Sequence, residues 1–328
     1  MSLPLTVVIV YRPFTQLLSE DVSYTVATDE NIKAAQDALT SAGLTTHIIH
    51  VDDDIESVLG VYDPASTVIF NYCDGFADNP SGYDPITQVF ERLGFAFTGA
   101  DDATLQWSQD KAITKQRLTR NNIPTPAYQI YDNSHMNGWS LFPALVKPAR
   151  QHGSLGISSH CVVETHAELQ QQVERVLDEW KQPALVEDFI EGDEYRVSMI
   201  GNGKLEMLPL MRVSPCVPGQ RYAVLDYETK WDEERARYDR QVQLDPRIYK
   251  RIMAAAKASF YAVDMRDYGA VDIRMRGDQA YVLDPNQNPD ISDYSYFLWV
   301  AEGAGYDYSK MLARIVQLAA ARLPRAPK

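Results

Sequence analysis

Residues 268 to 295, YGAVDIRMRGDQAYVLDPNQNPDISDYS, constrain the fold of this chain most. Two runs of strand-forming residues, Ala270 to Arg276 and Ala280 to Asp284, are joined by a short turn that contains Gly and Asp. This arrangement is typical of a β-hairpin. If the loop has three residues, Arg276 pairs with Ala280. That register sets Asp272 directly opposite Asp284. The sequence therefore predicts two carboxylates that face each other across neighbouring strands.

A divalent cation would suit this pair of carboxylates. Like charges opposite each other on paired strands, with Cβ atoms roughly 5 Å apart, are destabilising unless something lies between them. Asn286 follows Asp284 on the same strand face, so its amide oxygen would join the carboxylates. Such oxygen ligands are typical of Mg²⁺, which completes its shell with water and substrate phosphates. The hairpin predicts either a magnesium-nucleotide site or, as the alternative, a solvated acidic turn.

The chain is strongly acidic, because 45 Asp and Glu oppose 31 Lys and Arg among its 328 residues, for a formal net charge of −14. A surface of this sign repels nucleic acid and anionic membranes, so we expect small-molecule partners, no nucleic acid and no membrane. Three scattered cysteines support neither a disulfide framework nor a zinc site. The apolar run Leu5 to Val10 is too short for a signal peptide core or a membrane span. We therefore expect a cytoplasmic protein.

The first hundred residues alternate strand and helix patterns. We expect strands at Thr6 to Tyr11, Thr46 to Val51 and Val68 to Tyr72, helices at Asn31 to Ala42 and Pro85 to Leu93, and a polar loop at Arg12 to Ser23. This order predicts a small open α/β sheet, which binds ligands at the carboxyl ends of its strands. The loops at Glu20-Asp21 and at Asn71 to Gly75 lie there, although each taken alone is more often an ordinary surface loop.

A second block of patterns begins near Leu105. We expect a helix from Asp110-Lys111 to about Asn121, an apolar strand at Ala144 to Val146, a strand at Ile157 to Val163, and a helix that starts at the capping box of Thr165 and Glu168. The strand at 144 to 146 leads to Lys147 and a glycine-containing loop, Ala149 to Gly156. Glycines and a lysine can cradle a phosphate, although a lone Gly-Ser-x-Gly mostly marks an ordinary turn.

The acidic segment ALVEDFIEGDEYR, residues 184 to 196, also has two interpretations. Its carboxylates Glu187 and Glu194 could flank a nucleoside, with backbone groups reading the base. It could equally be an exposed connector between domains, which is the commoner use of such turns.

Taken together and in this order, the motifs resemble the ATP-grasp superfamily and, within it, the D-alanine–D-alanine ligase-like branch. The resemblance covers nearly the whole chain and rests on NYCDG, FTGADDATLQWSQDK, Lys147-Pro148 with its Gly/Ser loop, LVEDFIEGDEYRV, LDYETKW, VDIR and DPNQNPD. It implies an α/β fold of the ATP-grasp kind: a small open α/β N-terminal domain at residues 1–104, a central lobe at 105–184 and a C-terminal lobe at 185–328. A mobile segment, 212–241, would close over the site.

The resemblance also implies an activity: a carboxylate is phosphorylated by ATP, and an amine attacks the acyl phosphate. ATP with two Mg²⁺ ions would be required, and Mn²⁺ could substitute. Contacts to ATP are implied for Lys111, Lys147, Gly153, Ser154, Glu187, Ile190, Glu194 and Lys230. The metal ligands would be Asp272, Asp284 and Asn286. Residues in catalytic roles would be Lys230, Ser154 and Arg274, and residues at the substrate would be Asp21, Asp290 and Ser295.

The chain departs from the family pattern on the substrate side. Ala270 stands where ligases that make D-alanyl-D-alanine usually carry an Arg that stabilises the oxyanion. Arg274 shares that strand face but lies about 13 Å away along the strand. Further departures are Asp290 for a Gly, Gly153 for the first serine of a pair, Asp21 for a Glu and Asp284 for a Glu.

We therefore expect an ATP-dependent carboxylate–amine ligase whose small amino-acid-like substrates differ from the standard D-alanine pair. One alternative is a ligase-like kinase that condenses a non-peptide acceptor to an imine or amide. Another is a non-catalytic ATP-binding protein. A homodimer is a further expectation from the resemblance alone.

Overall fold

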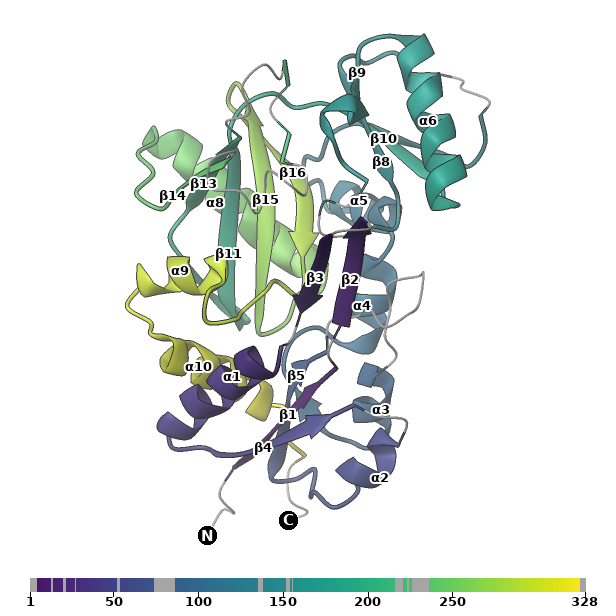
Figure 1. The fold of residues 1–328 in the computed structure, drawn as a ribbon. Helices are drawn as coiled ribbons and strands as arrows, with labels where there is room; N and C mark the ends of the chain where they lie inside the picture. Colours follow the sequence, from purple (N-terminus) through teal and green to yellow (C-terminus); the bar gives the residue numbers. More distant parts are fainter. Residues whose placement is uncertain are drawn as a thin grey trace.

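Three larger β-sheets with their own helices, and a separate two-stranded sheet, make up the described part of the chain (Figure 1). The computed structural model describes residues 5–12, 14–19, 22–26, 28–51, 54–73, 86–134, 138–151, 154, 156–215, 221–222, 224–225 and 236–324. Within these ranges no helix has the length and apolar character needed to cross a bilayer.

The first sheet is parallel and has the strand order β4-β1-β5-β6. Its elements are β1 (Thr6–Tyr11), α1 (Asp29–Ser41), β4 (Thr45–His50), α2 (Ile55–Leu59), β5 (Thr67–Tyr72), α3 (Ile86–Arg92) and β6 (Ala96–Phe97). Helices α1 and α10 (Tyr308–Ala320) pack on one face, and α2 and α3 pack on the other. Because both faces are covered, β1 is apolar at successive positions, as strands of parallel sheets are. The predicted strands and helices of this block are confirmed.

The polar loop predicted at residues 12 to 23 is wrong. Strands β2 (Phe14–Ser19) and β3 (Val22–Val26) pair antiparallel there, with Phe14 opposite Val26. Aromatic and β-branched residues, which favour strands, are frequent in this stretch. The sequence reasoning also missed a short helix, α4 (Asp102–Ser108), which is capped by the side chain of Asp101.

The central sheet has the strand order β7-β10-β8-β9 and is antiparallel. Its elements are β7 (Tyr128–Tyr131), β8 (Ala144–Pro148), β9 (Val162–Val163), α6 (His166–Trp180) and β10 (Ala184–Asp188), preceded by α5 (Lys111–Arg120). Helix α6 begins at the predicted capping box and packs on one face of the sheet. The strand predicted at Ile157 to Val163 is shortened to its last two residues, because Ser159–Cys161 form a 3₁₀ turn.

The third sheet has the strand order β14-β13-β11-β15-β16, with β12 paired to β11. Its elements are β11 (Glu194–Asn202), β12 (Lys204–Met207), β13 (Met211–Pro215), β14 (Ala236–Asp239), α8 (Pro246–Ala262), β15 (Tyr268–Arg276), β16 (Gln279–Asn286) and α9 (Tyr296–Glu302). Helix α8 covers one face, where Val197, Val271 and Ile273 are buried. Residues of the opposite parity, such as Arg196 and Asp272, lie on the other face.

Two features concern the extent of the central sheet and the contact between the first block and the third sheet. Strand β10 pairs with β7 and β8, so the central sheet extends past the domain boundary predicted at residue 184. Asp267, which is fully buried, accepts hydrogen bonds from Gly99 N, Asn202 Nδ2 and both terminal nitrogens of Arg322. This carboxylate therefore joins the N-terminal sheet region, the end of β11 and the residues just after α10. The exact division into domains stays a prediction.

Candidate functional site

The hairpin of β15 and β16 brings Asp272 and Asp284 opposite each other, as the sequence predicts. The turn differs from the predicted one, because it has two residues instead of three and Arg276 pairs with Gln279. A register shift next to Asp272 then restores the pairing of the two carboxylates. The predicted loop length is wrong, and the facing pair is confirmed. Its role as a metal site stays a prediction.

Asp272 is held by an arginine that the sequence reasoning missed. Arg196 lies opposite Asp272 on β11 and donates from Nε to Oδ1 at 2.6 Å and from Nη2 to Oδ2 at 2.7 Å. Burial would lower the pKa of Arg196, but the charge of Asp272, the hydrogen bonds to it and the charge of Glu194 together outweigh burial and raise the pKa, so the guanidinium stays protonated. The signal in the sequence was a charged residue two positions after Glu194, on the same strand face.

Arg274 is buried, with 4% of its surface exposed, and it faces the start of β11. It donates from Nε to Glu194 Oε2 at 3.1 Å and from Nη1 to the carbonyl oxygen of Ile190 at 3.0 Å. Burial raises the pKa of Glu194, and Arg274 counteracts that effect. The structure thus brings together Arg274 and two residues, Ile190 and Glu194, for which the resemblance implies contacts to ATP.

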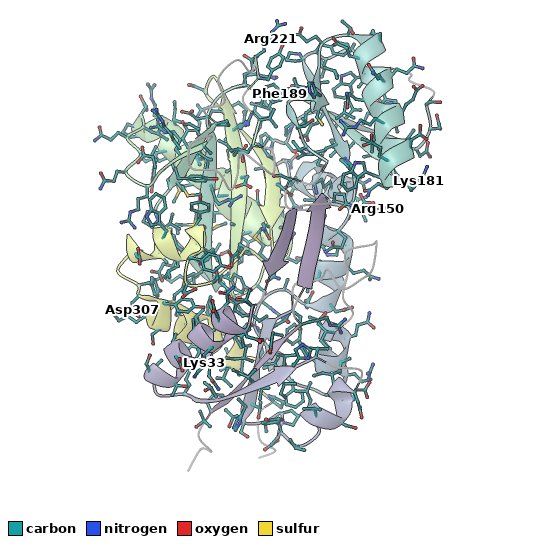
Figure 2. All side chains as sticks on the ribbon, in the orientation of Figure 1. Lys33, Arg150, Lys181, Phe189, Arg221 and Asp307 are labelled. Atoms are coloured by element: carbon teal, nitrogen blue, oxygen red, sulfur yellow. The ribbon has the colours of Figure 1, made fainter. Side chains whose placement is uncertain are left out.

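Arg276, two residues after Arg274 on β15, binds the linker between β10 and β11 as well. It donates to both oxygens of Asp188, at 2.6 and 2.9 Å, and to the carbonyl oxygen of Phe189 at 2.9 Å. Phe189 lies at the junction of the central and third sheets (Figure 2), where its ring meets Tyr222 edge to face at 5.3 Å. Two arginines of one strand therefore fix the linker between β10 and β11.

A buried charge cluster lies on the face of the central sheet that α6 leaves uncovered. Glu187 forms two ion pairs, from Oε1 to Lys147 Nζ at 2.6 Å and from Oε2 to Lys115 Nζ at 2.7 Å. These three side chains expose between 2% and 7% of their surface. Burial would raise the pKa of Glu187, but the two lysines outweigh it and bring the pKa down to about 2. Lys115 was missed by the sequence reasoning, although it follows Lys111 by one helical turn and so shares its face.

Lys111 and Asp284 connect the two halves of the site. Lys111 is buried and donates to the carbonyl oxygen of Gln151, and burial lowers its pKa. The charge of Asp284 acts in the opposite direction on Lys111 and helps to raise the pKa of Lys147. The carboxylate of the hairpin therefore acts electrostatically on both lysines of the central block.

The remaining predicted residues have the following positions. Asn286 is exposed, and its Oδ1 accepts from Asn288 N at 2.9 Å. Asp290 Oδ1 accepts from Ser292 N at 2.9 Å. Ser295 is buried and caps α9 by accepting from Leu298 N at 3.2 Å. Ser154 has a positive φ of 66°, a left-handed conformation typical of a tight turn.

Three predicted residues, Asp21, Gly153 and Lys230, lie outside the described residues, as does much of the predicted mobile segment 212–241. The described residues contain no group of three or more His, Cys, Asp or Glu side chains that could hold a metal. The predicted cation site, with the two carboxylates Asp272 and Asp284 and the amide of Asn286, stays a prediction.

Comparison with known proteins agrees with this arrangement. The family described as the D-ala D-ala ligase C-terminus matches residues 115–317, which is more than half of the chain. The chain belongs to this family. The resemblance to ATP-grasp D-alanine–D-alanine ligases and the predicted fold class are thereby confirmed.

Relatives of this ligase family cover most of the chain. The uncharacterized protein y4sG of Sinorhizobium fredii is 28% identical over 298 residues, which cover 86% of this chain and 85% of the relative. A D-alanine–D-alanine ligase of Desulforamulus reducens is 28% identical, over 71% of this chain and 76% of the relative.

A D-alanine–D-alanine ligase of Bacillus anthracis, solved as a complex with ATP, superposes with a TM-score of 0.74 at 20% identity and covers 98% of both chains. The VanG D-Ala:D-Ser ligase of Enterococcus faecalis superposes with a TM-score of 0.71 at 15% identity, over 97% of this chain and all of that one. The structural likenesses show the ligase fold.

Proposed function

We propose that this chain is an ATP- and Mg²⁺-dependent carboxylate–amine ligase that acts on small amino-acid-like substrates. The observation that carries the proposal is that Lys111 and Lys147 are both buried and that the charge of Asp284, on the hairpin of the third sheet, acts on both. Buried lysines beside a carboxylate suit a ligand that brings both phosphate charge and a divalent cation. The ATP complex of the Bacillus anthracis ligase, which has the same fold, supports ATP as that ligand.

The donor set on the hairpin fits Mg²⁺. Asp272 and Asp284 face each other in direct register, and such hard oxygen ligands suit this ion. We propose that these two carboxylates and Asn286 hold the metal, which when bound would neutralise charge on the phosphates. Lys111 and Lys147 would bind phosphate oxygens, and Glu187 would keep Lys147 charged and in place.

The nucleoside would lie against the linker between β10 and β11. We propose that Ile190 contacts the adenine and that Glu194 contacts the ribose. Arg274 is then a positioning residue, because it binds the carboxylate of Glu194 and the backbone of Ile190. We propose this positioning role in place of the catalytic role that the resemblance implies for Arg274.

The reaction we propose has two steps. A substrate carboxylate oxygen attacks the γ-phosphorus of ATP, the bond to the β,γ-bridging oxygen breaks, and ADP leaves. The amine of the second substrate then attacks the carbonyl carbon of the acyl phosphate, loses a proton and expels phosphate. One ATP is consumed for each amide bond formed.

We further propose that the substrates differ from the standard D-alanine pair. Position 270 is a buried Ala in register with Ser198, so β15 supplies no cation there. Losing a single oxyanion donor typically costs on the order of 10² to 10³ in rate. Asp290 adds a negative charge to the loop that follows β16. D-alanine should therefore be a poor substrate.

The test is ADP release, measured by a coupled assay, with D-alanine, a panel of larger amino acids and dipeptides, and mass spectrometry of the products. We expect substrate-stimulated ADP release with a member of the panel and weak release with D-alanine. Turnover of several per second with millimolar D-alanine, equal to or above every other candidate, would refute the substrate proposal. Absence of stimulated release throughout would refute the ligase and favour a nucleotide-binding protein, an alternative that the pairing of Arg196 with Asp272 makes worth testing.

A further inference from the structure

Four charged side chains lie on one face of β11 and β15, and the proposed ligase mechanism leaves one of them, Arg196, without a role. Glu194 lies opposite Arg274, and Arg196 lies opposite Asp272. The signs alternate along and across the two strands, so these four side chains compensate one another. Glu194 already forms an ion pair with Arg274. The ion pair of Arg196 with Asp272 is therefore the one that a ligand could break.

We propose that Arg196 is an exchangeable counterion, which holds Asp272 in the metal-free protein and is displaced when a divalent cation binds that carboxylate. The inference rests on the proposed function, because it concerns the same metal site. Both oxygens of Asp272 accept hydrogen bonds from the guanidinium, at 2.6 and 2.7 Å. A cation that coordinates either oxygen would face a permanent positive charge at hydrogen-bonding distance. The metal and Arg196 therefore compete for one carboxylate.

The displaced guanidinium needs a new anion. The Arg196 side chain is 22% exposed, and leaving a largely buried charge unpaired is costly. Its acidic neighbour Glu194 is engaged by Arg274 at 3.1 Å. An anionic ligand, either a phosphate group or a substrate carboxylate, is the natural replacement partner. Binding of the metal and binding of the anionic ligand are then coupled, since each favours the state in which Arg196 has left Asp272.

The experiment measures equilibrium binding of Mn²⁺ by electron paramagnetic resonance, first with Mn²⁺ alone and then with ADP, on the full-length chain. Arg196→Met removes the competitor, and Arg196→Lys keeps a charge but cannot bind both oxygens of Asp272. Arg212→Met is the matched control, because Arg212 lies on the adjacent strand β13 and pairs with Asp239 at 3.1 Å. Thermal melting of each variant, with and without Mn²⁺, gives a second readout.

We expect Arg196→Met to bind Mn²⁺ alone about ten- to a hundredfold more tightly than the wild type, the range typical of one hydrogen-bonded charge pair. Arg196→Lys should lie in between, and Arg212→Met should match the wild type. Without metal, Arg196→Met should melt below the wild type, and Mn²⁺ should raise its melting temperature more. The gain in Mn²⁺ affinity that ADP produces should be smaller in Arg196→Met.

Two other results separate this inference from the proposed function. If wild type and both Arg196 variants bind Mn²⁺ equally while the wild type releases ADP with a substrate, the counterion inference is overturned and the ligase stands. If no substrate stimulates ADP release but Arg196→Met binds Mn²⁺ more tightly than Arg212→Met, the ligase fails and the inference stands.

Discussion

Replacing Glu187 by glutamine tests the buried charge cluster of the central sheet most directly. Glu187→Gln keeps the size of the side chain but removes the charge that Lys115 and Lys147 share. Two buried ammonium groups would then lose the carboxylate with which both form ion pairs. We expect a large loss of stability, since removing one partner of a buried ion pair costs about 3 to 5 kcal/mol.

The pKa of Glu187 gives an independent magnitude. Its fall from 4.5 to about 2 corresponds to about 3 kcal/mol in favour of the ionised form, at about 1.4 kcal/mol per pH unit. Because the folded-state pKa lies below the unfolded one, this stabilisation is fully present above pH 4.5 and is lost as the pH falls toward 2. The difference between wild type and variant should therefore be constant near neutral pH and shrink across that acidic window.

Urea denaturation followed by circular dichroism at pH 7 and through the acidic range would measure this difference. Glu179→Gln is the control, because Glu179 pairs with Arg175 at 2.9 Å on the exposed face of α6. Exposed pairs of this kind contribute about 0 to 1 kcal/mol. If Glu187→Gln were no more destabilising than Glu179→Gln at pH 7, the cluster would not stabilise the fold and our reasoning would be refuted.

Three further predictions concern other parts of the site and its frame. Asp284→Asn should abolish substrate-dependent ADP release while the far-ultraviolet circular dichroism is retained; full activity with unchanged Mg²⁺ dependence would contradict the metal role. Asp267→Asn should lower the free energy of unfolding by about 3 to 5 kcal/mol, because it removes the fully buried carboxylate that binds Arg322, whereas Asp264→Asn, at a side chain 57% exposed, should cost about 0 to 1 kcal/mol in the same urea titration. Arg274→Met should weaken ATP binding measured by calorimetry, because it releases the carboxylate and the carbonyl that Arg274 holds, and an unchanged Kd would exclude its positioning role.

Local signals in the sequence were sufficient for elements whose ends and faces are determined by neighbouring residues. The helix α6 was predicted from the reciprocal bonds of Thr165 and Glu168, and the structure has both. Strand β1 was predicted from a continuous apolar run, which fits its burial on both faces. Lys147 was placed correctly at a strand end because the strand before it is short and apolar.

The missed residues of the site share a different property. Arg196 and Lys115 each take their role from a partner distant in sequence, Asp272 and Glu187 respectively. No local periodicity reports such a pairing, since an isolated Arg in a strand or Lys in a helix is mostly a solvated side chain. Only the register of β11 against β15, and the approach of α5 to β10, bring these charges together.

In the hairpin of β15 and β16, the predicted loop length was wrong, although the predicted pairing of Asp272 with Asp284 was right. Ala280 and Val282 pack against α8, whereas Asp284 must lie on the opposite face with Asp272. Residues 282 and 284 have the same parity, so a regular strand would put them on one face. A bulge next to Leu283 resolves the conflict by adding one residue, and it compensates for the turn that is one residue shorter than predicted. The apolar pattern of β16 thus carried the signal for the bulge, because burying Val282 and presenting Asp284 to the site are incompatible without it.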